Sequence, residues 1–134
     1  MNGLNELRDK IHENAKTKGF YDVEKKALNI YPTGENKDLQ HAFFAQKIAL
    51  IHSELSEALE ADRKDNRAKF DNFVTHDVLS EFELLIKNTV EDELADVIIR
   101  TLDVCGWLGI DIQKHVELKM KYNELRDYKH GKKY

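Results

Sequence analysis

The chain has 134 residues, of which 34% are charged and 41% hydrophobic, and its formal net charge is −4. This length favours one domain with a core of its own, and the composition is typical of a helix-rich protein in water. An acidic balance gives no extended basic surface, which excludes nucleic acid as the expected main partner.

The chain carries no signal for secretion or membrane insertion. Its N-terminus lacks the apolar core of a signal peptide, and no run approaches the length of a transmembrane helix. Cys105 is the single cysteine, so no disulfide can form within the chain. We therefore expect a cytoplasmic protein without a membrane partner.

The first half of the sequence predicts two helices joined by a long connection. Apolar residues at helical spacing predict a helix over residues 4–17, ended by Gly19. Residues 19–38 contain Pro32, the only proline, and a Thr-Gly turn signal, which indicate a partly ordered connection. A second helix is predicted over residues 38–62, with an apolar stripe formed by Phe44, Ile48, Ile51, Leu55 and Leu59.

The second half predicts a turn over residues 64–70, a shorter helix within 76–87 and two further helices. One begins near Val90 with three acids in its first turn, which suits the positive end of the helix dipole. We expect it to continue to Trp107, where Gly106 and Gly109 break it. Asp111 is a good N-cap for the last helix, which runs to about Arg126.

Alternation typical of strands is nowhere sustained, and no linker divides the chain. The predicted fold is therefore all-α, an antiparallel bundle of four to five helices in a single domain over residues 1–134.

Acidic side chains flank the apolar stripe of the second helix. At about 100° per residue, Glu54 lies on one flank, and Glu57 lies further round the same flank. Gln46 projects from that flank as well. Glu60 points elsewhere, close to the line of Lys64, and is expected to be solvated.

The helix that starts at Val90 shows the same arrangement. Its apolar stripe runs beside Glu93, Asp96, Arg100 and Asp103, which follow one another at spacings of three, four and three. Arg100 is expected to pair with Asp103. Packed antiparallel, the two helices would bring the four carboxylates of Glu54, Glu57, Glu93 and Asp96 together.

Acid pairs at this spacing are common on solvated helix faces, and each pair alone carries little information. Both pairs, however, border apolar stripes, where unpaired carboxylates are costly. Clustered carboxylates repel one another unless a cation lies among them, and all-oxygen ligation suits Mg²⁺ or Mn²⁺ better than zinc. A di-iron site is disfavoured, because it requires Glu-x-x-His and the sequence contains none.

The motifs IHSELSEALEADRK and EDELADVIIRTLDVCG resemble those of the MazG-like nucleotide pyrophosphohydrolases, in the all-α nucleoside-triphosphate pyrophosphatase superfamily. The opening IHENAKTKGFYD and the closing KMKYNELRDYKHGKKY also resemble its small members, so the likeness covers nearly the whole chain. The stretch FDNFVTHDVLSEF departs from the family pattern, and variation there is expected to alter which base is accepted.

The resemblance implies a Mg²⁺-dependent enzyme that cleaves a nucleoside triphosphate between its α- and β-phosphates, leaving the monophosphate and pyrophosphate. The four acids would hold the cation, and Glu54 or Glu57 would be the general base. Lys119, Asn123 and Arg126 share one helix face and would contact phosphate and sugar, while Gln46 would read a base edge. Small members usually complete each site with a second subunit, so a homodimer or a dimer of dimers is expected.

One rival class stays open from the residues alone. A non-enzymatic all-α interaction module would use the same acids to bind a structural cation or a basic partner. For the tail residues, the competing interpretation is a basic helix end that stabilises its own dipole. Release of pyrophosphate from a nucleotide distinguishes the enzyme from the module.

Overall fold

The computed structural model describes residues 3–30, 36–73 and 76–131, and in these ranges the chain is all-helical without a strand. The all-α prediction is confirmed there, although six α-helices are present where four to five were expected. None of the described helices is long and apolar enough to cross a membrane. The helices are α1 (Leu4–Thr17), α2 (Asp22–Ile30), α3 (Asn36–Arg63), α4 (Val78–Leu85), α5 (Val90–Trp107) and α6 (Ile112–Glu124).

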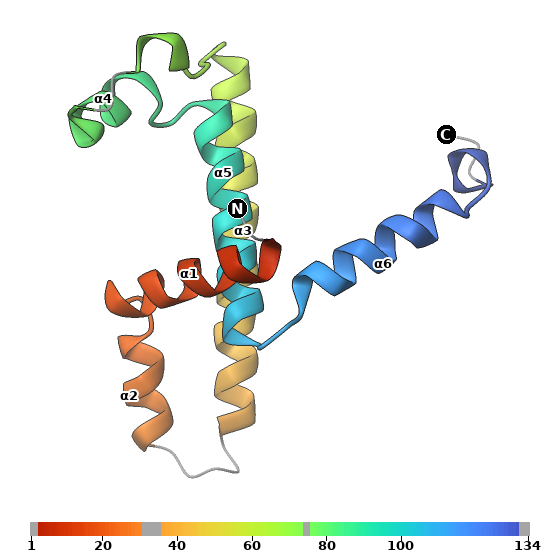
Figure 1. The fold of residues 1–134 in the computed structure, drawn as a ribbon. Helices are drawn as coiled ribbons and strands as arrows, with labels where there is room; N and C mark the ends of the chain where they lie inside the picture. The colour runs from red at the N-terminus through yellow and green to blue at the C-terminus, as the bar shows by residue number, and fades with distance from the viewer. Residues whose placement is uncertain (1–2, 31–35, 74–75, 132–134) are drawn as a thin grey trace.

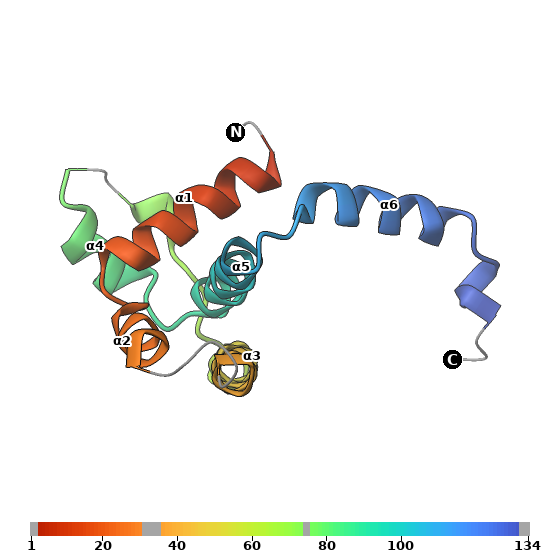
Figure 2. The same cartoon turned by 90° about the horizontal axis from the view of Figure 1, so that it is seen from below.

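The centre of the fold is the antiparallel pair of α3 and α5, which run side by side along most of α5 (Figure 1). Helix α1 crosses α5, and α2 lies beside the N-terminal part of α3. Helix α4 lies to one side of the pair, near the C-terminal end of α3 (Figure 1). Seen end-on, α3 and α5 are neighbours, with α1 and α2 to one side of them (Figure 2).

Small residues make the buried face of α3. The buried residues of α3 are Glu54, Ala58 and Ala61, whereas Leu55 is 44% and Leu59 52% exposed. The predicted apolar stripe is therefore not the main buried face of the single chain. Alanines let two helix backbones approach closely, and the flank that carries Glu54 is turned inward as a result. Helix α5 buries Glu93, Leu102, Val104 and Cys105.

Helix α2 occupies a region predicted as a connection, so that prediction is wrong for residues 22–30. A helix of this length is marginal by itself and gains stability from tertiary contacts. Its Glu24 is buried and pairs with Lys47 of α3 at 2.6 Å. The predicted turn at Pro32 lies outside the described residues.

The other predicted helices are confirmed, with ends within two residues for α1, α3, α5 and α6. Helix α4 lies inside the predicted range 76–87. The Asp111 side chain accepts a hydrogen bond from the Lys114 amide, as expected of an N-cap, and the Thr89 hydroxyl caps α5 in the same way.

Helix α5 ends at Trp107 as predicted, but Gly106 lies within the helix and does not break it. Gly109, with φ +65°, lies just beyond the helix end in the left-handed region that favours glycine. A Cβ atom added at Gly106 would lie 2.6 Å from the Cβ of His12 in α1. The glycine therefore permits the close crossing of α1 and α5.

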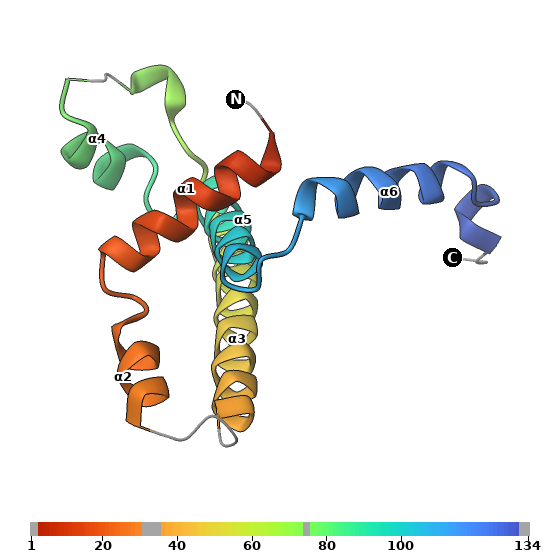
Figure 3. The same cartoon turned by 60° about the horizontal axis from the view of Figure 1, so that its bottom comes forward.

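Helix α6 leaves the α3–α5 pair and projects away from it in all three views (Figures 1, 2 and 3). Its start is tied to α1, where the Asn5 amide donates to Asp111 and the Arg8 guanidinium donates to the carbonyl of Ile110. Helix α6 therefore does not join α3 and α5 in the predicted antiparallel bundle within the single chain. Five large hydrophobic residues near or within α6 are exposed, namely Val116, Leu118, Met120, Tyr122 and Leu125.

Replacing Gly106 by alanine should destabilise the fold by about 2 kcal/mol, because the added methyl overpacks the α1–α5 crossing. Helix propensity alone would favour alanine by about 1 kcal/mol. Chemical denaturation of Gly106→Ala measures the net change. In a His12→Gly background, which removes the opposing Cβ, the same substitution should be neutral or stabilising. Equal effects in both backgrounds would contradict the close-crossing explanation.

Candidate functional site

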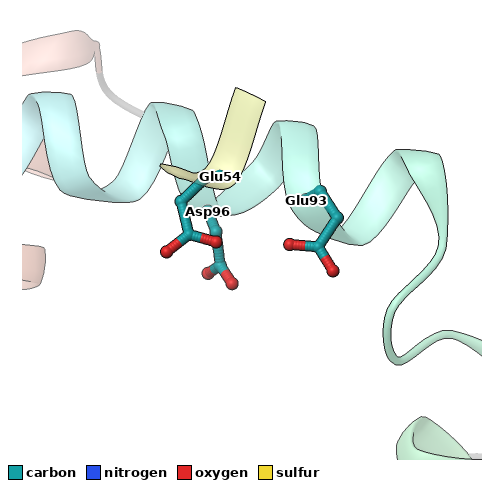
Figure 4. A group of neighbouring side chains, drawn as sticks. All are labelled: Glu54, Glu93 and Asp96. Carbon is teal, nitrogen blue, oxygen red and sulfur yellow. The ribbon is translucent and has the colours of Figure 1, made fainter. Parts of the chain in front are cut away.

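Three carboxylates from two helices converge on one side of the α3–α5 pair (Figure 4). Glu54 comes from α3, whereas Glu93 and Asp96 lie one turn apart on α5. One carboxylate oxygen from each of these residues lies within 4.8 Å of the others. Glu54 is 6% and Glu93 4% exposed, and Asp96 is half-buried. We call this group the acid cluster.

Glu57, the fourth predicted acid, is exposed and lies outside the acid cluster. It accepts a hydrogen bond of 3.4 Å from Ser53, one turn earlier on α3. Its charge still acts on the cluster, because it contributes to the raised pKa of Glu93. The structure therefore brings three of the four predicted acids together and leaves the fourth at the edge. Glu60 is exposed, as expected, and it pairs with Lys64.

The negative charge of the acid cluster is only partly compensated by cationic side chains. Burial and, after it, the charges of Glu57, Asp92 and Glu54 together raise the pKa of Glu93 to about 7. Burial also raises the pKa of Asp96, followed by the charges of Asp92 and Glu54. Within the described part of the chain, neither Glu93 nor Asp96 forms an ion pair. A bound cation would relieve this repulsion.

Arg100 pairs with Glu54 and not with Asp103, so the predicted Arg100–Asp103 pair is wrong. The Arg100 Nε donates to Glu54 at 2.6 Å. Asp103 instead accepts a hydrogen bond of 2.7 Å from the Tyr21 hydroxyl, and its other oxygen lies 2.8 Å from Nδ1 of His12. His12 comes from α1 where it crosses α5, and Tyr21 comes from the turn between α1 and α2. The packing of α3 supplies Glu54.

A pocket of about 620 Å³ opens next to the acid cluster, between α1, α2, α3 and α5. Asp96 belongs to both the pocket wall and the acid cluster. Gln46, predicted to contact a base, lines the same pocket. Apolar walls come from Ile11, Ala15, Phe20, Leu50, Ile99 and Val104. This volume lies within the usual range of small-ligand pockets.

Lys47, in the wall of the pocket, belongs to a network of contacts that the sequence did not reveal. Lys47 pairs with buried Glu24, and its ammonium lies 4.1 Å from the ring centre of Tyr21 and 5.2 Å from that of Trp107. Burial and the hydrogen bond to Asp103 raise the pKa of Tyr21. These residues come from distant parts of the chain, so no local spacing signals their association.

Lys119, Asn123 and Arg126, the predicted phosphate- and sugar-binding residues, follow α6 away from the acid cluster (Figure 1). The cationic groups of Lys119 and Arg126 lie 4.9 and 5.5 Å from the ring centre of Tyr122, on the same helix face. The single chain therefore does not bring these residues together with the acids.

Comparisons with protein-family models, with curated proteins and with solved structures found no match to this chain.

In metal-free protein, the free energy of unfolding should fall by about 2 kcal/mol as the pH rises from 4.5 to about 7. In this window unfolded Glu93 is ionised, whereas the folded state retains the proton, so rising pH favours unfolding. Glu93→Gln carries no ionisable group at this position, so its free energy of unfolding should lack this fall. Urea denaturation at several pH values with a chelator present measures the difference.

The matched control is Glu60→Gln, which alters an exposed acid on α3 whose pKa is lowered by Lys64 and Arg63, so that this variant should retain the fall with rising pH. Added Mg²⁺ should stabilise wild-type protein more at the alkaline end of the window, because the cation and the proton compete for Glu93. Identical pH profiles for the wild type and Glu93→Gln would contradict the raised pKa.

Proposed function

We propose that this protein is a Mg²⁺-dependent nucleotide pyrophosphohydrolase that cleaves the α–β phosphate bond of a nucleoside triphosphate. The observation that carries the proposal is the convergence of Glu54, Glu93 and Asp96 at the edge of a pocket large enough for a nucleoside. The resemblance of the two acidic motifs to MazG-like enzymes supports the same reaction.

The acid cluster has the chemistry that a Mg²⁺ site requires. Its donors are carboxylate oxygens on two packed helices, and Mg²⁺ prefers oxygen ligands from one or two carboxylates together with water and substrate phosphates. Mn²⁺ accepts the same ligands. The raised pKa of Glu93 and of Asp96 indicates negative charge without sufficient compensation, which a divalent cation would offset.

Bound Mg²⁺ would neutralise phosphate charge and lower the pKa of a coordinated water. Glu54, Glu93 and Asp96 would hold it, and the pocket would orient the nucleoside so that the α-phosphate faces the acids. Attack of water on the α-phosphorus forms one P–O bond and breaks the bond to the bridging oxygen, with pyrophosphate leaving. Glu57 is favoured over Glu54 as the general base, because Glu54 is held by Arg100.

The pocket would take the nucleoside. Gln46 and Asn14 offer amide groups that suit a base edge, and apolar side chains suit the base faces. Lys119, Asn123 and Arg126 would contact the phosphates or sugar of a substrate held by another subunit, because α6 projects away from its own acid cluster.

A homodimer or a dimer of dimers is proposed on physical grounds as well. Exposed hydrophobic residues lie on α3, α5 and α6, among them Leu59, Ile98 and Met120. Exposed apolar side chains on several helices favour association, and closed symmetry would bury them on both subunits.

With Mg²⁺ present, a panel of nucleoside triphosphates should yield the monophosphate and pyrophosphate from at least one member. Orthophosphate should appear only after a pyrophosphatase is added, and a chelator should abolish turnover. Ion-exchange chromatography identifies the products. A nucleoside diphosphate with orthophosphate would mean attack at the γ-phosphorus and contradict the proposed bond. Absence of turnover across the panel would favour the interaction module.

The same assay tests the acids. Glu54→Gln and Asp96→Asn should each lower kcat at least about a hundredfold, because each removes charge from the proposed cation site. Circular dichroism should remain helical. Glu60→Gln is the matched control on α3 and should keep wild-type turnover. Near-normal rates in both site variants would refute the assignment.

Light scattering at micromolar concentration should give two or four times the mass of the chain. Leu118→Glu and Met120→Glu each place a charge on the exposed apolar surface of α6 and should shift the mass towards one chain. His115→Glu, on the same helix and also exposed, is the matched control. A single-chain mass for active wild-type protein would contradict the assembly.

A further inference from the structure

Arg100 uses only part of its hydrogen-bonding capacity. Its Nε donates to Glu54, and among the described residues its two terminal nitrogens have no hydrogen-bond partner. The side chain is 41% exposed and lines the pocket beside Asp96. An arginine has five N–H donors in a fixed plane, so bonding through Nε leaves the terminal nitrogens able to bind an anion.

The other cations of the pocket wall are already paired. Lys47 is held by buried Glu24 at 2.6 Å, and its side chain is only 13% exposed. Lys10 pairs with Glu6 along the outer surface of α1, where its side chain is 70% exposed. Arg100 is therefore the cation of the described pocket wall that both contacts the acid cluster and retains unused donors.

We infer that Arg100 is a substrate-binding residue whose terminal nitrogens bind the α-phosphate while its Nε orients Glu54. This inference rests on the proposed function, and it assigns the residue that joins the nucleoside pocket to the acid cluster. Planar guanidinium groups bind phosphate oxygens with good geometry.

The position of Arg100 explains why the α-phosphate is the group bound. A nucleoside in the pocket with its triphosphate at the acid cluster must place the α-phosphate at their junction, where Arg100 and Asp96 lie. Three carboxylates repel a phosphate, so a fixed cation at this junction lowers that repulsion. Lys119 lies on the projecting α6 and Arg126 lies just beyond its end, so neither serves this position within one chain.

The test compares each of dAMP, dCMP, dGMP, dTMP and dUMP with its own nucleoside by isothermal titration calorimetry in Mg²⁺. The ratio of the nucleoside Kd to the monophosphate Kd isolates the contribution of the α-phosphate. In Arg100→Gln this ratio should fall by about tenfold for the best-bound pair, while the nucleoside Kd stays unchanged.

Mn²⁺ binding to the protein alone, followed by electron paramagnetic resonance, separates phosphate binding from an effect on the acids. Arg100→Gln should retain a Mn²⁺ Kd within about threefold of the wild type. Arg100→Lys keeps the charge without the planar group, so the Kd ratio should fall by about threefold, which is half of the tenfold effect on a logarithmic scale. It also provides a second folded variant if Arg100→Gln is unstable. Arg63→Gln, an exposed arginine at the end of α3, should change neither quantity.

An unchanged Kd ratio in Arg100→Gln and Arg100→Lys would overturn the inference while leaving the proposed function standing. A fall in the ratio accompanied by a tenfold or greater loss of Mn²⁺ affinity would also overturn it, because Arg100 would then act only through Glu54. If no nucleotide, nucleoside or Mn²⁺ binds wild-type protein, the proposed function fails and the inference fails with it.

Discussion

The close packing of α3 against α5 is the contact on which the other features depend. Ala58 and Ala61 leave room for the two helices to approach, and the same faces carry Glu54 and Glu93 into buried positions. Burying a carboxylate costs free energy unless a cation or hydrogen-bond donors compensate it. Arg100 compensates Glu54, whereas neither Glu93 nor Asp96 forms an ion pair within the described chain. The contact that stabilises the fold thus also creates a demand for a cation.

A second crossing completes the pocket. Because Gly106 has no side chain, α1 approaches α5 closely and brings His12 and Tyr21 to Asp103. Those hydrogen bonds satisfy Asp103, which leaves Arg100 to interact with Glu54 instead. One glycine therefore influences which acids are neutralised within the fold and which remain exposed to a cation. The close approach of α1 and α5 at Gly106 therefore affects both the packing and the pairing of charges at this site.

The basic residues proposed to bind phosphate lie in two separate places. Arg100 lies at the acid cluster of its own chain, whereas Lys119 on α6 and Arg126 just beyond it lie beside Tyr122. In the proposed function the substrate carries several negative charges, and one arginine would offset only part of them. Association of chains, favoured by the exposed apolar residues of α6, would allow the second set to contribute.

The sequence by itself determined which residues share a helix face, because a helix turns about 100° per residue whatever surrounds it. Periodicity and capping residues therefore located α1, α3, α5 and α6, and placed Glu54 on one flank of its helix. Only the tertiary structure decided which flank is buried, that residues 22–30 form a helix, and that Arg100 pairs with Glu54 rather than with Asp103. Those outcomes depend on contacts between segments far apart in the chain, and no local spacing encodes how closely two helices approach.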